Sequence, residues 1–230
     1  MLRLYIANKN YSSWSLRPWV LMRQLGIAFE ETLVPFGDPG QPSPFRAFSP
    51  SGRVPCLVDG DTVIWDSLAI VEYLAEGDAR VWPADRLARA WARCAAAEMH
   101  AGFSDLRNVC PMSCGIRVRI DRVPPALARD VARIDELWCE GLARFGAGFL
   151  AGDAFTAVDA FFAPVVFRVQ SYALALSAPA SAYVARVLAL APMQAWYEAA
   201  LAEAWRDKAH EAEATTAGVL LADHRRPASG

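Results

Sequence analysis

Three serine hydroxyls stand together in a short turn near the start of the chain, in the stretch "NYSSWSLRP" from Asn10 to Pro18. An apolar run precedes this turn and a helical pattern follows it, so the serines lie at the start of a helix. Hydroxyls at that position can accept hydrogen bonds from the unpaired N–H groups of the first helical turn. They can also donate a hydrogen bond to an anion that the positive end of the helix attracts. Both uses stay open for Ser12, Ser13 and Ser15.

The elements around this turn define a first domain, residues 1–77. A short strand precedes the turn, and the helix after it ends at Gly26. A second strand follows, and the Asp59-Gly60 step indicates a β-hairpin between two more strands. Asp66 and Ser67 then begin a helix that stops at Gly77. The order β-α-β-β-β-α is typical of a thioredoxin-like domain, with elements expected at 3–7, 16–25, 29–36, 54–58, 62–65 and 67–77.

In redox members of the thioredoxin-like fold, the first helix begins with the pattern CxxC, because the helix end stabilises a thiolate. Ser12 and Ser15 have that spacing here. Since a hydroxyl cannot form a disulfide, we do not expect a disulfide oxidoreductase. The turn can instead donate a hydrogen bond to the thiolate of another molecule.

Residues 85–230 are predicted to form an all-α domain without strands, after a linker at 78–84. The clearest helix begins at Pro125 and is closed by Gly146. Thr156 and Asp159 form a capping box with a structural role. The last fifteen or so residues show no periodicity, so we expect them to be mobile. Other helices are expected at 85–107, 156–170, 181–190 and 193–206.

The composition excludes several classes of protein. Hydrophobic residues make up 54% of the 230 residues and the formal net charge is −2, so neither a disordered chain nor a nucleic-acid-binding surface is indicated. No apolar run is long enough to cross a bilayer and the N-terminus does not resemble a secretory signal, so we expect a cytoplasmic protein that does not bind membranes. The five cysteines, with Cys110, Cys114 and His100 considered as ligands, match no disulfide or zinc spacing, so we expect reduced thiols and no metal.

Four motifs, in this order, resemble the cytosolic glutathione S-transferase family, and the resemblance covers nearly the whole chain. "SSWSLR" is similar to the serine turn of the theta-like and zeta-like classes, and "GRVPCLVDG" to the strand that carries a cis-proline. "WDSLAIVEYL" is similar to the acidic-serine signature before a helix, and "FLAGDAFTAVDAFFAPVV" to the capping box of the helical domain. The resemblance implies an α+β thioredoxin-like domain followed by an all-α domain. It departs at Trp14, where the zeta-like turn usually has a cysteine.

The resemblance implies that glutathione binds to the first domain as a co-substrate. Ser12 is the first candidate for the hydrogen-bond donor to its thiolate, followed by Ser13 and then Ser15, and Tyr11 is a weaker alternative. A thiol with a pKa near ~8.5 needs about 1.4 kcal/mol of preferential stabilisation of the anion to lower that pKa by one unit. One hydroxyl and a helix end can supply this amount.

The resemblance also implies where the rest of glutathione binds. A cis Pro55 would direct the N–H and C=O groups of Val54 toward the cysteinyl backbone, as in an added strand; a trans proline at a strand start is the alternative. Ser67 suits the γ-glutamyl carboxylate and Asp66 the α-amine, although both also fit an ordinary helix N-terminus. Two further candidates, for the glycyl end or the peptide, are Arg53 and Gln41.

A pocket for a small apolar electrophile is expected between the serine turn and the first long helix of the second domain. Its candidate residues are Trp14, Met99, Phe103 and Arg107, for most of which core packing is the alternative. The resemblance therefore implies a homodimeric glutathione transferase with a role in detoxification. A glutathione-dependent isomerase of the maleylacetoacetate type, a dehalogenase, a peroxidase and a non-catalytic binding module are the alternatives.

Overall fold

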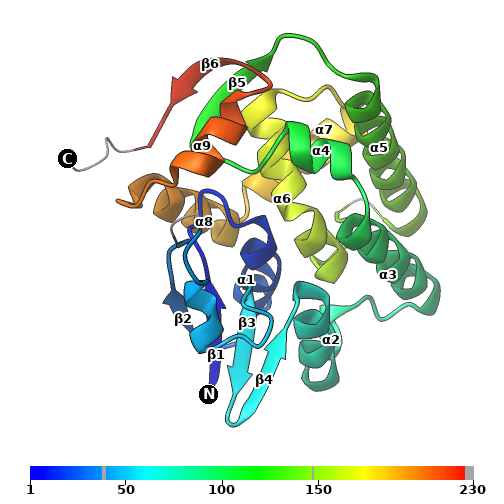
Figure 1. Ribbon diagram of the computed structural model, residues 1–230. Coiled ribbons are helices and arrows are strands. Elements are labelled where there is room, and N and C mark those ends of the chain that lie inside the picture. Colours follow the sequence, from blue (N-terminus) through cyan, green and yellow to red (C-terminus); the bar gives the residue numbers. More distant parts are fainter. Residues whose placement is uncertain (38–39, 147, 226–230) are drawn as a thin grey trace.

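A computed structural model of the chain describes residues 1–37, 40–146 and 148–225. A four-stranded sheet with its helices forms the N-terminal part, and the remainder is mainly helical (Figure 1). This arrangement confirms the predicted α+β domain followed by a helical domain. None of the described helices has the length and apolar character needed to cross a bilayer.

The N-terminal sheet has the strand order β2-β1-β3-β4. β1 (Leu2–Ile6) pairs in parallel with β2 (Phe29–Leu33) and antiparallel with β3 (Cys56–Asp59). β3 pairs antiparallel with β4 (Thr62–Trp65), so the predicted hairpin is present. The chain turns between them at Gly60, whose φ of 56° is readily accessible to a residue without a Cβ atom.

Two helices pack with this sheet. α1 (Ser13–Leu25) joins β1 to β2 and contacts two helices of the second half, α6 (Ala157–Tyr172) and α8 (Ala191–Ala202). α2 (Ser67–Gly77) follows β4. α1 begins at the second serine of the turn, three residues earlier than predicted. Short 3-10 helices follow at η1 (Pro44–Ala47) and η2 (Ala79–Val81). Because Trp82 and Val81 are buried, the predicted linker is a packed segment.

The helix predicted at 85–107 is two helices in the structure, α3 (Arg86–Ala101) and α4 (Ser104–Val109). Gly102 ends α3 in an extended conformation, and a Cβ atom there would lie 2.9 Å from the carbonyl oxygen of Glu98. Phe103 follows with a φ of 58°, in the left-handed region. The chain therefore changes direction, and the single-helix prediction was wrong.

Four of the remaining described helices agree with the predicted ones to within a few residues, whereas the fifth, at 208–215, was not predicted. α5 begins at Pro125 and ends before Gly146, as the sequence indicates. α6 is buried along most of its length and lies in the middle of the helical half (Figure 1). The bounds are α5 (Pro125–Phe145), α6 (Ala157–Tyr172), α7 (Ala178–Leu188), α8 (Ala191–Ala202) and α9 (Lys208–Thr215).

The predicted absence of strands from the second half was wrong. β5 (Ile116–Ile120) and β6 (Gly218–Asp223) form an antiparallel two-stranded sheet. The β5 sequence IRVRI alternates apolar and charged residues, which is a strand signal that the sequence analysis missed. β6 also falls in the segment that was expected to be mobile, and residues 226–230 of that segment lie outside the described residues.

Candidate active site

The second half of the chain holds the serine turn in place. The carboxylate of Glu203 accepts a hydrogen bond from the backbone N–H of Lys9 at 2.5 Å, and Trp196 donates its indole N–H to the Lys9 carbonyl at 2.9 Å. The side chain of Asn10 donates to the carbonyl of Ala200. These contacts are buried, so the start of α1 keeps a fixed position relative to the helical half.

The three serines have different surroundings. Ser12 lies at the N-cap position of α1 but makes no capping hydrogen bond; its hydroxyl donates to Ser15 Oγ at 2.7 Å. Ser15 is fully buried, and its oxygen also accepts the N–H of Ala7 at 3.3 Å. Ser12, at 5% exposure, and Ser13 line a cavity of about 390 Å³. Ser15 is absent from the cavity wall, so it can act on a bound molecule only through Ser12.

Tyr11 lines the same cavity, but its hydroxyl is engaged elsewhere. It donates to a carboxylate oxygen of Glu211 at 2.8 Å and accepts from Arg225 Nη1 at 3.1 Å. Burial, followed by the hydrogen bond to Glu211, raises the pKa of the Tyr11 phenol above its ordinary value. Since its single proton is used within the protein, Tyr11 is poorly suited to donate to a thiolate.

A second cavity, of about 330 Å³, adjoins the first. Trp14, Arg53 and Val54 line both cavities, so the two form one continuous depression. Ser12 and Ser13 lie toward one end, and Asp66 and Ser67 lie at the other. The bond between Val54 and Pro55 is cis, as expected from the resemblance. Most of the predicted glutathione-binding residues thus lie along one depression, whereas Gln41 is exposed and lines neither cavity.

Arg17 connects α1 to the Asp66 end of this depression. Its Nη1 donates to Ser67 Oγ at 3.3 Å, and its guanidinium lies 4.1 Å from the centre of the Trp14 ring and 4.9 Å from that of Phe161. Burial lowers the pKa of Arg17 well below its ordinary value, and the nearby arginines lower it further. Arg17 was not among the predicted site residues, although its position one turn beyond Ser13 on α1 could have indicated it.

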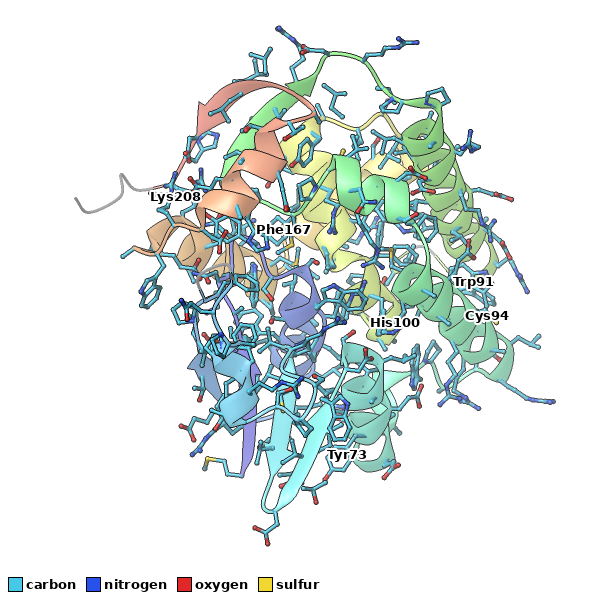
Figure 2. All side chains as sticks on the ribbon, in the orientation of Figure 1. Tyr73, Trp91, Cys94, His100, Phe167 and Lys208 are labelled. Atoms are coloured by element: carbon cyan, nitrogen blue, oxygen red, sulfur yellow. The ribbon has the colours of Figure 1, made fainter. Side chains whose placement is uncertain are left out.

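Asp66 begins α2 and meets a histidine from the second half. Its Oδ1 accepts the N–H of Leu68 at 2.8 Å, so the predicted capping role is present, and its Oδ2 lies 3.6 Å from Nε2 of His100. Its φ of 74° is unusual for a residue with a side chain. His100, labelled near the centre of Figure 2, also contacts Trp14 edge-on. Burial lowers the pKa of His100, which favours the neutral imidazole.

Only two of the four residues predicted for the electrophile pocket line it. Trp14 and Arg107 lie on the wall, with the Arg107 guanidinium 4.8 Å from the centre of the Trp14 ring. Met99 and Phe103 are buried in the core and line neither cavity, so for them the prediction was wrong. The break at Gly102 is the reason, because residues on either side of it no longer share a helix face.

The cavity is also lined by residues that were not predicted from the sequence. Arg168 from α6 and His210 from α9 contribute to it, with Phe36, Phe45 and Met112 as apolar neighbours. Arg168 follows Phe167, which is labelled on α6 in Figure 2. No local pattern marks these residues, because they reach the site from segments that are distant in the sequence.

The cysteines take no part in the site. All five are free, and Cys110 and Cys114 are buried. Burial raises the pKa of the Cys110 thiol to about 12 and also raises that of Cys114, so both stay protonated at neutral pH. Among the described residues, no group of three or more histidine, cysteine, aspartate or glutamate side chains could hold a metal ion.

Comparison with known proteins points to one family. The family described as glutathione S-transferase, N-terminal domain, matches residues 11–76. A zeta-class glutathione S-transferase of Euphorbia esula is 30% identical over 159 residues, which cover 67% of this chain and 71% of that protein. Matches to two dichloromethane dehalogenases and a plant glutathione S-transferase are shorter and span only 20 to 29% of those proteins.

Solved structures show the same fold. A glutathione transferase homologue from Burkholderia, with bound glutathione, has a TM-score of 0.64 and 24% identity, over 86% of this chain and 97% of the other. A maleylacetoacetate isomerase from Methylobacterium extorquens, with bound malonate and glutathione, has a TM-score of 0.63 and 24% identity, over 85% and 95% of the two chains. The chain belongs to the glutathione S-transferase family.

Proposed function

We propose that the chain is a glutathione transferase that binds glutathione along the continuous depression and activates its thiol beside Ser12 and Ser13. The observation that carries this proposal is the meeting of two cavities at Trp14, Arg53 and Val54, with the serines in one and Asp66 in the other. An extended tripeptide has three chemically different parts, and this depression offers a different set of partners to each part.

The γ-glutamyl group of glutathione binds at the Asp66 end. Ser67 and the N-terminus of α2 suit its carboxylate, and the Asp66 carboxylate suits its amine. The cysteinyl backbone pairs with the backbone of Val54, and Arg53 contacts the glycyl end. The related structure from Burkholderia has bound glutathione, which supports this use of the fold.

The thiolate lies at the positive end of α1, where Ser12 donates a hydrogen bond to it and Ser13 is the second candidate. A serine hydroxyl can rotate its proton, so Ser15 can donate to Ser12 while Ser12 donates to the sulfur. Two cationic side chains on the wall, Arg53 and Arg107, further favour the anion. The thiolate then attacks an electrophilic carbon in the neighbouring cavity.

Glutathione titration with the ultraviolet absorbance of the thiolate tests this proposal. The wild-type protein is expected to bind glutathione at millimolar concentration or below and to lower the pKa of its thiol by at least one unit from about 8.5. The Ser12→Ala protein should lose most of that shift, and Ser13→Ala should lose less. Absence of saturable glutathione binding by the folded wild-type protein would contradict the proposal.

The alternative reactions, isomerisation and peroxide reduction, use the same glutathione thiolate and differ from the transferase reaction in the second substrate. Rates with an activated aryl halide, an organic peroxide and a cis-enone diacid separate transferase, peroxidase and isomerase. Glutathione binding without turnover of any of them would favour a binding module.

We also propose that the chain acts as a homodimer and that it acts in the cytoplasm. The resemblance is the main support for the dimer, and the 46% exposed Trp65 side chain on the edge strand β4 offers apolar surface to a second copy. Sedimentation at micromolar concentration tests the dimer, and cell fractionation tests the location.

A further inference from the structure

The cavity beside the serines contains a buried positive charge without a carboxylate partner. Arg168 is 3% exposed, and its Nε donates to the carbonyl of Cys110 at 2.8 Å. Within the described part of the chain, no aspartate or glutamate forms an ion pair with its guanidinium, although the residue lines the cavity. A buried charge without a partner is costly, and proteins usually pair it.

The surroundings of Arg168 increase that cost. Arg107 and Arg17 lie close enough for the arginines to repel one another, and burial together with Arg107 lowers the pKa of Arg168 to about 10. The guanidinium therefore still carries its charge at neutral pH. Glu213 is the only carboxylate among the described residues of the cavity wall, and its side chain is exposed on α9.

Apolar side chains make up much of the rest of the wall, which also includes Tyr11, Ser43 and His210. The apolar part consists of Trp14, Phe36, Phe45, Pro111 and Met112, which line the same cavity as the serines and the arginines. A ligand that fills this space must therefore combine an apolar body with a negative group. A guanidinium presents two parallel N–H donors that match the two oxygens of a carboxylate.

The geometry points to an electrophilic co-substrate that carries a carboxylate on an apolar body, with Arg168 as the residue that binds the carboxylate and Arg107 as its cationic neighbour. This inference rests on the proposed function and narrows it, because a small apolar electrophile without charge leaves Arg168 unpaired. It also assigns Arg168 a role in choosing the substrate rather than in activating glutathione.

A matched pair of substrates tests the inference: 4-(bromomethyl)benzoate and its methyl ester. In both, the glutathione sulfur forms a bond to the benzylic carbon while the carbon–bromine bond breaks and bromide leaves with the bonding electron pair. The reacting carbon is the same, so the ratio of kcat/KM for the acid to that for the ester, after subtraction of the uncatalysed rate, reports recognition of the carboxylate.

The Arg168→Met protein is expected to lower this acid-to-ester ratio at least tenfold. Arg168→Lys retains the charge and should recover part of the ratio, and Arg129→Met, which removes an exposed arginine on α5, should match the wild-type protein. An unchanged ratio in folded Arg168→Met overturns the inference. A raised Kd for glutathione with an unchanged acid-to-ester ratio also overturns the inference, because Arg168 would then contribute to glutathione binding and not to recognition of the carboxylate.

Benzoate and benzamide provide a readout that needs neither glutathione nor a variant. The wild-type protein is expected to bind benzoate at least ten times more tightly than benzamide, measured by calorimetry. Equal affinities overturn the inference even if Arg168→Met does not fold. If glutathione fails to bind but benzoate is still preferred, the proposed function fails while the carboxylate site stands.

Discussion

The hydroxyl oxygens of Ser12 and Ser15 lie 2.7 Å apart, and Ser15 also accepts the backbone N–H of Ala7. These groups form a chain of hydrogen bonds that begins inside the protein and ends at the cavity wall. In the structure Ser15 accepts both hydrogen bonds. When Ser12 turns its proton toward a bound thiolate, Ser15 can donate to Ser12, and the polarised chain then strengthens Ser12 as a donor. We therefore propose that Ser15 is a positioning residue whose effect on catalysis depends on Ser12.

We predict that Ser15→Ala lowers kcat/KM about three- to tenfold and Ser12→Ala about ten- to a hundredfold, because a hydrogen bond to a charged group is worth about 1.5–3 kcal/mol. The double variant should be no worse than Ser12→Ala alone, since Ser15 acts through Ser12. Multiplicative losses in the double variant would show that the two serines act independently. Because Ser15→Ala also leaves the Ala7 N–H without its acceptor, rates are compared well below the unfolding temperature.

A second prediction concerns Arg17, which donates to Ser67 and stacks with Trp14. Lysine keeps the charge but has a compact ammonium that cannot make both contacts. We expect Arg17→Lys to raise the Kd for glutathione about tenfold, which corresponds to about 1.4 kcal/mol. Arg23→Lys, on the exposed last turn of α1, is the matched control and should bind normally. Normal binding by folded Arg17→Lys would show that the Ser67 contact is dispensable.

Tyr11→Phe gives a third prediction. The Tyr11 proton is donated to Glu211, so its removal should leave the pKa of the glutathione thiol unchanged. The lost hydrogen bond should reduce the free energy of unfolding by about 1 kcal/mol. Thiolate absorbance against pH checks the first part, and urea denaturation checks the second. A bound thiol whose pKa rises by a unit in this variant would make Tyr11 the donor.

The parts of the site that could be predicted from sequence are those made by neighbouring residues. The serine turn, the Asp59-Gly60 hairpin and the Asp66 helix start each depend on residues a few positions apart, and the structure contains all three. Arg168 could not be found this way, because it reaches the cavity only after α6 packs against α1. For Phe103 a local signal existed, since the preceding glycine is a helix breaker, but the helical pattern continues across it.

A fourth prediction concerns pH and stability. Asp159 accepts the backbone N–H groups of Leu150 and Thr156 and the hydroxyl of Tyr183, so the predicted capping box is present. Burial nevertheless raises the pKa of Asp159 from an ordinary value of 3.8 to about 6, and the hydrogen bonds oppose this rise. The folded protein then holds this proton more tightly than the unfolded chain.

The stabilising contribution of this proton is complete below about pH 3.8 and is lost as the pH rises through about 6. This contribution to the free energy of unfolding is at most about 3 kcal/mol, because a pKa shift of about two units corresponds to that amount. Urea unfolding of the wild-type and Asp159→Asn proteins between pH 4 and pH 7 measures it, because asparagine has no proton to lose. The advantage of the wild-type protein should shrink as the pH rises, and parallel curves would contradict the shifted pKa.

The pairing of β5 with β6 has a consequence for synthesis. One strand precedes α5, whereas the other is among the final residues that the structure describes. During translation the earlier strand must therefore wait for its partner until residues 218–223 have left the ribosome. The contacts between α9 and Tyr11 also form late, so a nascent chain that already has its thioredoxin-like half still lacks part of the cavity wall beside the serines.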